Sequence, residues 1–194
     1  MKLKKIEYDK VFSVAFVLFI IAYLFSARVK SWPIMALLSL GFFKPNVPDA
    51  AHEKLQPAPV LVVQNIKGQT TDLQQLRGKV VFVNFWAVWC PPCLAELPSV
   101  DKLYRKLKDN PDIIFITVDI DNNLPRSSAM LQHRGYALPV YGISKDAAPG
   151  QFWPDMIPTT FVIDKKGEMV FKEQNRADYN DDKFVRFMTG LSKE

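Results

Sequence analysis

The sequence is poor in residues that bind metals or cross-link distant parts of a chain, because it has only two cysteines and two histidines among 194 residues. A structural zinc site takes four ligands, and only His52 and His133 are available to join the two cysteines, so zinc is not expected. Covalent haem attachment needs a histidine directly after a Cys-x-x-Cys motif. The residue after Cys93 is Leu94, which excludes haem.

The main part of the chain also lacks an excess of positive charge. Residues 57–194 carry 17 Lys/Arg against 16 Asp/Glu, whereas residues 1–56 carry 8 against 4, so most of the net charge of +5 is N-terminal. A nucleic-acid partner is therefore not expected. With 48% hydrophobic and 12% aromatic residues, the chain does not have the composition of a disordered protein.

One long uncharged run is present, VFSVAFVLFIIAYLFSA at residues 11–27. Its 17 residues are at the short end of the length that crosses a bilayer as a helix. The lysines that precede it favour a cytoplasmic N-terminus. We predict a retained single-pass transmembrane anchor within residues 1–30. A cleaved signal peptide remains the alternative, although Phe25 interrupts the small-residue pattern of a cleavage site.

Residues 31–56 are predicted to be an apolar stalk followed by a proline-rich linker. The apolar stretch 32–43 is too short to span a membrane and either lies in the membrane interface or belongs to the stalk. Four prolines in residues 44–59 limit regular structure there. The remaining residues, 57–194, have the size of one domain.

The pattern of this domain predicts an α/β fold. GKVVFVNFWA (78–87) is almost continuously apolar, as in a strand buried on both faces at the centre of a sheet. A helix with apolar spacings of three and four follows from Pro91, and Pro98 predicts a kink in it. Other strands are expected in 60–64, 112–120 and 138–144, helices in 125–135 and 181–191, and a hairpin with strands 159–164 and 168–173. This order predicts a mixed sheet with flanking helices on both faces.

The two cysteines lie in the motif Cys-Pro-Pro-Cys, between the predicted central strand and the predicted helix. A cysteine at a helix N-terminus is favoured as a thiolate, so Cys90 is expected to be a nucleophile toward disulfides. Cys93 lies one helical turn further on and can resolve the mixed disulfide. A static structural disulfide is the alternative.

The segment GKVVFVNFWAVWCPPCLAELP (78–98) resembles the active-site segment of membrane-anchored or exported thioredoxin-like proteins of the TlpA/ResA type. IPTTFVIDKKG (157–167) resembles their second signature. The resemblance implies a thioredoxin fold after the N-terminal transmembrane helix, and redox exchange with protein thiols that uses no cofactor beyond a Cys90–Cys93 disulfide. It also implies a cis Ile157–Pro158 bond facing that disulfide.

The resemblance further implies a role for each matching position. It implies that an extended client segment binds beside Pro158, and we expect Trp89, Pro91, Pro92 and Ile157 to be client-binding positions as well. Trp89 either shields the Cys90 thiolate from water or covers the edge of the core. Glu96 matches a family glutamate three residues after the second cysteine, and as a catalytic residue it would exchange protons with Cys93. Its alternative is a solvated residue on the outer helix face. Asn84 stands where cytoplasmic thioredoxins carry a buried aspartate, and asparagine cannot carry a proton at neutral pH.

Phe152 and Trp153 precede the second signature, and they either contact a client or cover the core.

Together these features predict a thiol-disulfide oxidoreductase, tethered to the bacterial inner membrane with its domain on the periplasmic side. The resemblance implies reduction of protein disulfides, with apocytochrome c as a client and a membrane protein of the DsbD/CcdA kind as electron donor. A disulfide oxidant or isomerase on the same fold is the alternative. A thiol peroxidase is not expected, because Ala87 stands where such enzymes carry a threonine. A copper-binding metallochaperone would need His133 beside the two thiols.

Overall fold

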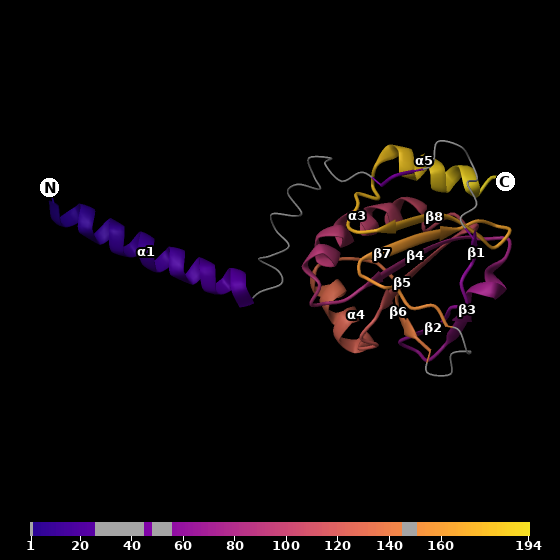
Figure 1. Ribbon diagram of the computed structural model, residues 1–194, viewed down its shortest axis with the longest axis horizontal. Helices are drawn as coiled ribbons and strands as arrows, with labels where there is room; N and C mark the ends of the chain where they lie inside the picture. The colour runs from indigo at the N-terminus through magenta and orange to yellow at the C-terminus, as the bar shows by residue number, and fades with distance from the viewer. Residues whose placement is uncertain (1, 26–44, 48–55, 145–150) are drawn as a thin grey trace.

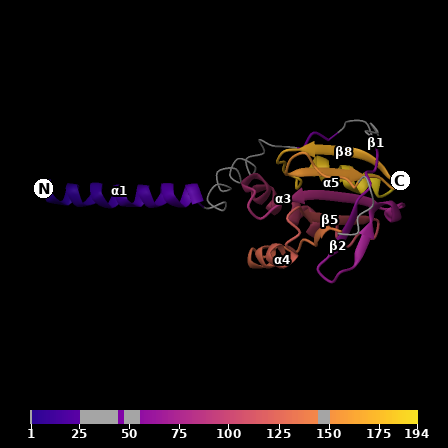
Figure 2. The ribbon, with the colours of Figure 1, turned by 60° about the horizontal axis from the view of Figure 1, so that its bottom comes forward.

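The computed structural model describes residues 2–25, 45–47, 56–144 and 151–194 (Figure 1). Its first element, α1 (Lys2–Phe25), projects away from the rest of the chain in two views (Figures 1 and 2). The predicted stalk at 31–43 lies outside the described residues.

The transmembrane helix predicted within residues 1–30 is not found: no helix in the described part of the chain is long and apolar enough to cross a membrane. The uncharged part of α1 runs from Val11 to Phe25. It is about 22 Å long at 1.5 Å per residue, against about 30 Å for a bilayer core. Residues 26–30 of the predicted anchor lie outside the described ranges.

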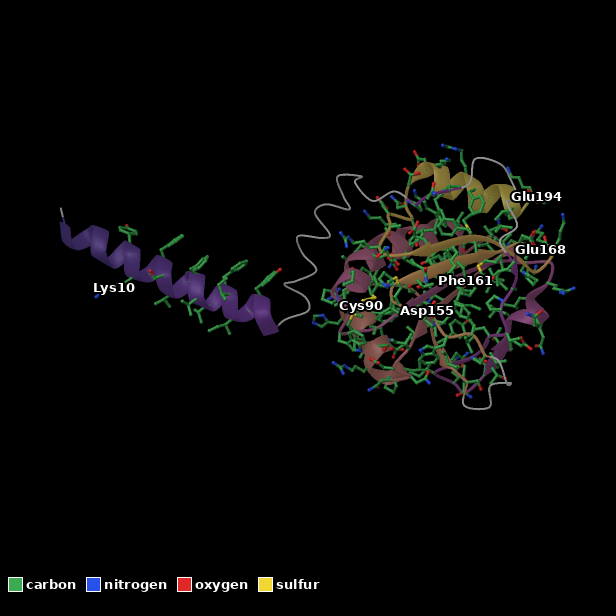
Figure 3. The ribbon with its side chains drawn as sticks, viewed as in Figure 1. Lys10, Cys90, Asp155, Phe161, Glu168 and Glu194 are labelled. Atoms are coloured by element: carbon green, nitrogen blue, oxygen red, sulfur yellow. A yellow bond between two sulfur atoms is a disulfide. The ribbon has the colours of Figure 1, made fainter. Side chains whose placement is uncertain are left out.

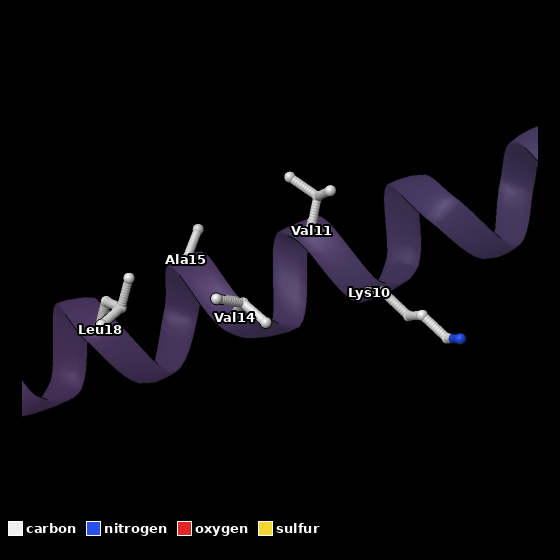
Figure 4. A pocket seen from close by; sticks show the side chains of 5 residues that line it. All are labelled: Lys10, Val11, Val14, Ala15 and Leu18. Carbon is white, nitrogen blue, oxygen red and sulfur yellow. The ribbon is translucent and has the colours of Figure 1, made fainter.

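A shallow apolar pocket runs along one side of α1 (Figure 4). It is lined by Lys10, Val11, Val14, Ala15 and Leu18. The side chains described from Lys10 to Tyr23 are all exposed. This helix therefore packs on no other described element.

The domain is built on one eight-stranded mixed sheet in the order β1-β8-β7-β4-β5-β6-β2-β3. Strands β4, β5 and β6 are parallel, and the other pairs are antiparallel. The strands are β1 (Gln56–Pro57), β2 (Val62–Asn65), β3 (Thr70–Asp72), β4 (Val80–Trp86), β5 (Ile113–Asp119), β6 (Val140–Ile143), β7 (Thr159–Ile163) and β8 (Glu168–Gln174).

Strand β4 lies near the middle of the sheet, between β5 and β7, and all seven of its residues are buried. This confirms the buried strand predicted from its continuous apolar sequence. Alternate residues of β4 point into two separate core clusters, one containing Phe82 and Trp86 and the other Val83 and Phe85. Asn84 has the same parity as Phe82 and Trp86, so it is a polar residue on the face of the first cluster.

Among the described residues, three α-helices flank the sheet: α3 (Pro91–Leu107), α4 (Leu124–His133) and α5 (Asp182–Leu191). The prediction of helices on both faces is wrong for these α-helices, because every Cys, Leu, Val, Phe and Met side chain that they bury belongs to the first cluster. Both crossovers, β4-α3-β5 and β5-α4-β6, step in the same direction across the sheet, and right-handed crossovers then put their helices on one face. The second cluster is closed by β2, the 3-10 helix η1 (Leu73–Leu76) and Phe152.

Two parts of the predicted linker pack on the domain. Gln56 and Pro57 form β1 against β8. Val47 is only 5% exposed and belongs to the first core cluster, and its carbonyl accepts a hydrogen bond of 3.1 Å from Lys183 Nζ on α5. The chain before β2 is thus held at two points.

Candidate active site

Cys90 and Cys93 form a disulfide where β4 gives way to α3, at the edge of the domain (Figure 3). Cys90 is the N-cap of α3, and Pro91 opens the helix, where a proline loses no intrahelical hydrogen bond. The Cys93 backbone N–H donates to Cys90 Sγ at 3.2 Å. An N–H aimed at a sulfur favours its thiolate once the disulfide is reduced, and the helix N-terminus acts in the same direction.

Glu96 lies on α3 one turn after Cys93 and is only 1% exposed, so the expectation of a solvated residue on the outer helix face is excluded. Glu96 Oε1 accepts a hydrogen bond of 2.7 Å from Asn84 Nδ2 on β4. Glu96 Oε2 accepts one of 3.0 Å from the backbone N–H of Ala177. Helix α3 therefore turns this carboxyl inward, toward the centre of the sheet.

Burial raises the pKa of Glu96 to about 8, and the charge of Glu173 contributes to the increase. The hydrogen bonds from Ala177 and Asn84 act in the opposite direction, but they do not compensate for lost hydration. Glu96 can thus hold a proton at neutral pH. Residues three apart lie on the same side of a helix, so Glu96 follows Cys93 on that side of α3, one turn further on.

Tyr179, from the segment before α5, is another titratable group near Glu96. Its side chain is fully buried among Phe82, Phe171 and Phe184. Burial raises the pKa of the Tyr179 hydroxyl, and the charge of Glu96 adds to the increase. This tyrosine therefore stays neutral and adds no charge near the carboxyl.

The predicted client-binding positions come from two loops. Trp89 is 53% exposed, and its indole Nε1 donates a hydrogen bond of 2.7 Å to Asp121 after β5. Pro91 and Pro92 are partly exposed at the start of α3. The Ile157–Pro158 bond is cis, as the resemblance implied. The register between Phe85 and Thr159 aligns the start of β7 with the end of β4, the strand that leads to Cys90.

Phe152 and Trp153, the two aromatics before the second signature, have different environments. Phe152 packs against Phe85 with its ring tilted and against Phe161 edge to face, and it covers the second core cluster. Trp153 is 54% exposed, and Met156 is 49% exposed. The structure thus assigns one aromatic to the core and leaves Trp153 on the surface.

Sequence reasoning missed three groups at this site. Thr160 accepts from Asn84 Nδ2 at 2.9 Å, Asp121 orients Trp89, and the Ala177 N–H binds Glu96. Thr160 is within the second signature, but only the pairing of Asn84 with Thr160 across β4 and β7 identifies it as a partner. The other two carry no sequence signal.

Among the described residues, no group of three or more His, Cys, Asp or Glu side chains is placed to hold a metal ion. His133 closes α4 and is exposed. The arrangement instead offers a dithiol/disulfide pair at a helix N-terminus with a buried carboxyl behind it.

Comparison with known proteins agrees with this chemistry. Residues 50–184 match the Redoxin family. The thiol-disulfide oxidoreductase ResA of Bacillus thuringiensis (strain Al Hakam) is 35% identical over 133 residues, which cover 67% of this chain and 73% of that protein.

Solved structures show the same fold. A thiol:disulfide interchange protein of the thioredoxin family from Chlorobium tepidum TLS superposes with a TM-score of 0.56 at 25% identity, covering 74% of this chain and 99% of that one. StoA from Bacillus subtilis superposes with a TM-score of 0.54 at 23% identity, covering 68% and 96%, and shows the fold alone. The predicted resemblance is confirmed: the chain belongs to the Redoxin family, as a TlpA/ResA-like thiol-disulfide oxidoreductase of the thioredoxin fold.

Proposed function

We propose that this oxidoreductase reduces disulfides in protein clients, with Cys90 as the attacking thiolate. The observation that carries the proposal is the buried Glu96 carboxyl, one helical turn after Cys93, because it provides a proton donor and acceptor inside the site. A purely structural disulfide needs no such group. Exposed Trp89 and the partly exposed Pro91, Pro92 and Ile157 support a client surface around Cys90, whereas Pro158 is buried.

The reaction proceeds in two exchanges. The Cys90 thiolate attacks one sulfur of the client disulfide, that S–S bond breaks, and the other client sulfur leaves as a thiolate that takes a proton from solvent. Cys93 then loses its proton to the Glu96 carboxylate and attacks Cys90. The Cys90–Cys93 disulfide forms as the bond between Cys90 and the client sulfur breaks. That sulfur leaves as a thiolate and takes a proton from solvent, so the client departs with both of its sulfurs reduced.

Regeneration reverses these proton movements. A donor dithiol supplies two electrons, and Cys93 leaves as a thiolate that takes the proton back from Glu96. Because the pKa of Glu96 is about 8 in the disulfide form, the group is mostly protonated at neutral pH and holds the proton that this step requires.

The direction of electron flow is tested by the reduction potential of the pair and by trapping. We expect a potential below about −200 mV, nearer the about −270 mV of thioredoxin than the about −120 mV of a strong oxidant. In cells, Cys93→Ser should accumulate mixed disulfides on Cys90, and the matched Cys90→Ser variant should not. A potential near −120 mV would instead support the oxidant alternative.

We further propose that the domain works on the outer side of a bacterial cytoplasmic membrane, tethered through its N-terminal segment. The exposed apolar side chains of α1 and the lysines in its first turns support this. A DsbD/CcdA-type membrane protein would then supply electrons, and apocytochrome c would be a client. Alkaline extraction of the full chain, beside a version beginning at Gln56, tests the tether: release of both into the soluble fraction would refute it. Mass spectrometry of the trapped complexes identifies donor and client.

A further inference from the structure

Asn84 makes an asymmetric set of contacts at the centre of the domain. Its Nδ2 donates both hydrogens, to Glu96 Oε1 at 2.7 Å and to Thr160 Oγ1 at 2.9 Å. Its Oδ1 is buried and has no hydrogen-bond partner among the described residues. Buried amide oxygens normally accept a hydrogen bond. In Asn84 the nitrogen end thus has both of its hydrogen bonds, and the oxygen end has none.

These contacts suit the carboxylate form of Glu96 best, because both of its oxygens accept a hydrogen bond. If a neutral Glu96 is to donate its proton toward Asn84, the proton has to sit on Oε1, since Oε2 faces the Ala177 N–H. There it would face the hydrogens of Asn84 Nδ2, donor against donor. The observed orientation of Asn84 is therefore the one that suits the Glu96 carboxylate.

A half-turn of the Asn84 amide brings an acceptor to Oε1 with little change in shape, because its oxygen and nitrogen ends have nearly the same shape. It also moves the two Nδ2 hydrogens to the present position of Oδ1, which has no hydrogen-bond partner among the described residues. Oδ1 then faces Glu96 and Thr160, and its two lone pairs accept the Glu96 O–H and the Thr160 O–H. The Thr160 hydroxyl suits both orientations, since a hydroxyl donates as well as accepts. Either state of Glu96 thus has an Asn84 orientation that gives it a hydrogen bond.

We propose that Asn84 is a positioning residue whose amide reverses when Glu96 gains or loses a proton, so that Glu96 keeps one place and one hydrogen bond throughout the redox cycle. This inference rests on the proton role proposed above for Glu96. It explains how a residue that cannot itself carry a proton takes part in proton transfer.

The groups around Glu96 allow the reversal to be assigned to this carboxyl. Glu173 on β8 and Tyr179 before α5 are the titratable groups that interact with it from other elements, and Cys90 and Cys93 lie on its own helix. The test therefore uses the disulfide form, in which neither cysteine titrates. The raised pKa of Tyr179 places its ionisation above the range in which Glu96 titrates.

Nuclear magnetic resonance of the full chain in its disulfide form tests the proposal. The carboxyl carbon of Glu96 reports its titration, and the Asn84 amide group reports its own orientation. Above the Glu96 midpoint we expect a through-hydrogen-bond coupling between Asn84 Nδ2 and the Glu96 carboxyl, which disappears below it. Cross-peaks from the Asn84 Nδ2 hydrogens to Glu96 should weaken over the same pH range.

Two variants sharpen the test. Glu96→Gln presents a permanent amide donor toward Asn84 while still accepting from Ala177, so the Asn84 amide should stay reversed at every pH. If the Asn84 amide reverses, Asn84→Leu removes a hydrogen-bond partner from both protonation states of Glu96, so the ionisation constant of Glu96 should change less than about threefold. If the amide is instead fixed as a donor, it stabilises the Glu96 carboxylate alone, and Asn84→Leu should shift the ionisation constant of Glu96 at least about tenfold.

The outcomes separate the two proposals. A Glu96 carboxyl that titrates beside an Asn84 amide of fixed orientation overturns the reversal and leaves the proton role of Glu96 in place. A Glu96 carboxyl that does not titrate between pH 4 and 10 overturns both. The wild-type measurement decides even if Asn84→Leu fails to fold.

Discussion

Replacing Glu96 by glutamine should change how the stability of the domain depends on pH. The pKa of Glu96 is about 8 when folded, and it returns to about 4.5 when the chain unfolds. Between these values the unfolded chain releases a proton that the folded domain retains. Because the folded domain binds the Glu96 proton more tightly than the unfolded chain does, this proton stabilises the fold. That stabilisation is fully present below about pH 4.5 and is lost as pH rises toward 8. At 1.36 kcal/mol per pKa unit, wild type should lose about 3 kcal/mol relative to Glu96→Gln between pH 5 and pH 8.

Urea unfolding of the two disulfide forms across pH 5 to 8 measures this difference. Asp109→Asn is a matched control, since it also removes one negative charge but from an exposed side chain. The control should follow wild type, whereas Glu96→Gln should lack the decrease. Parallel curves for wild type and Glu96→Gln would show that Glu96 is ionised in the folded domain, and would refute the argument from burial.

Three further substitutions test individual contacts by urea unfolding at neutral pH. Asp119→Ala removes the buried carboxylate that accepts from the N–H groups of Asp121 and Asn123 and from Ser127 Oγ, so stability should fall by about 2–4 kcal/mol. Asp119→Asn should recover part of that loss. An unchanged unfolding midpoint would mean that water satisfies those donors. Asp181→Ala removes the N-cap of α5 and should lower stability by about 1 kcal/mol, whereas Asp181→Ser keeps a capping oxygen and should be nearly as stable as wild type. If Asp181→Ser loses as much stability as Asp181→Ala, the capping role is contradicted. Val47→Ala should lower stability by about 1 kcal/mol and speed proteolysis before β1, and cleavage at the wild-type rate would argue against its docking.

Local patterns predicted the framework of the site well. Continuous apolar residues identified β4, and the helical spacing after Pro91 located α3, which contains Pro98. The N-terminal position of Cys90 followed from these two elements. Each inference used residues close together in the sequence, where spacing and side-chain type carry most of the information.

Contacts between distant segments could not be predicted in the same way. The sequence of α3 alone allows Glu96 to be either buried or exposed. Its buried position depends on the hydrogen bond from Asn84 on β4, which is itself bonded to Thr160 on β7. The prediction of helices on both faces failed because it counted helices without following the direction of the crossovers. Val47 was placed in a linker because its partners on α5 lie 136 residues away.

The docking of Val47 couples the chain before β1 to the last helix of the domain. Val47 shares the first core cluster with Phe184 and Met188 of α5, and its carbonyl accepts a hydrogen bond from Lys183. Opening of α5 therefore also removes the partners of Val47. The two segments, 136 residues apart in the sequence, should open as one cooperative unit in native-state hydrogen exchange.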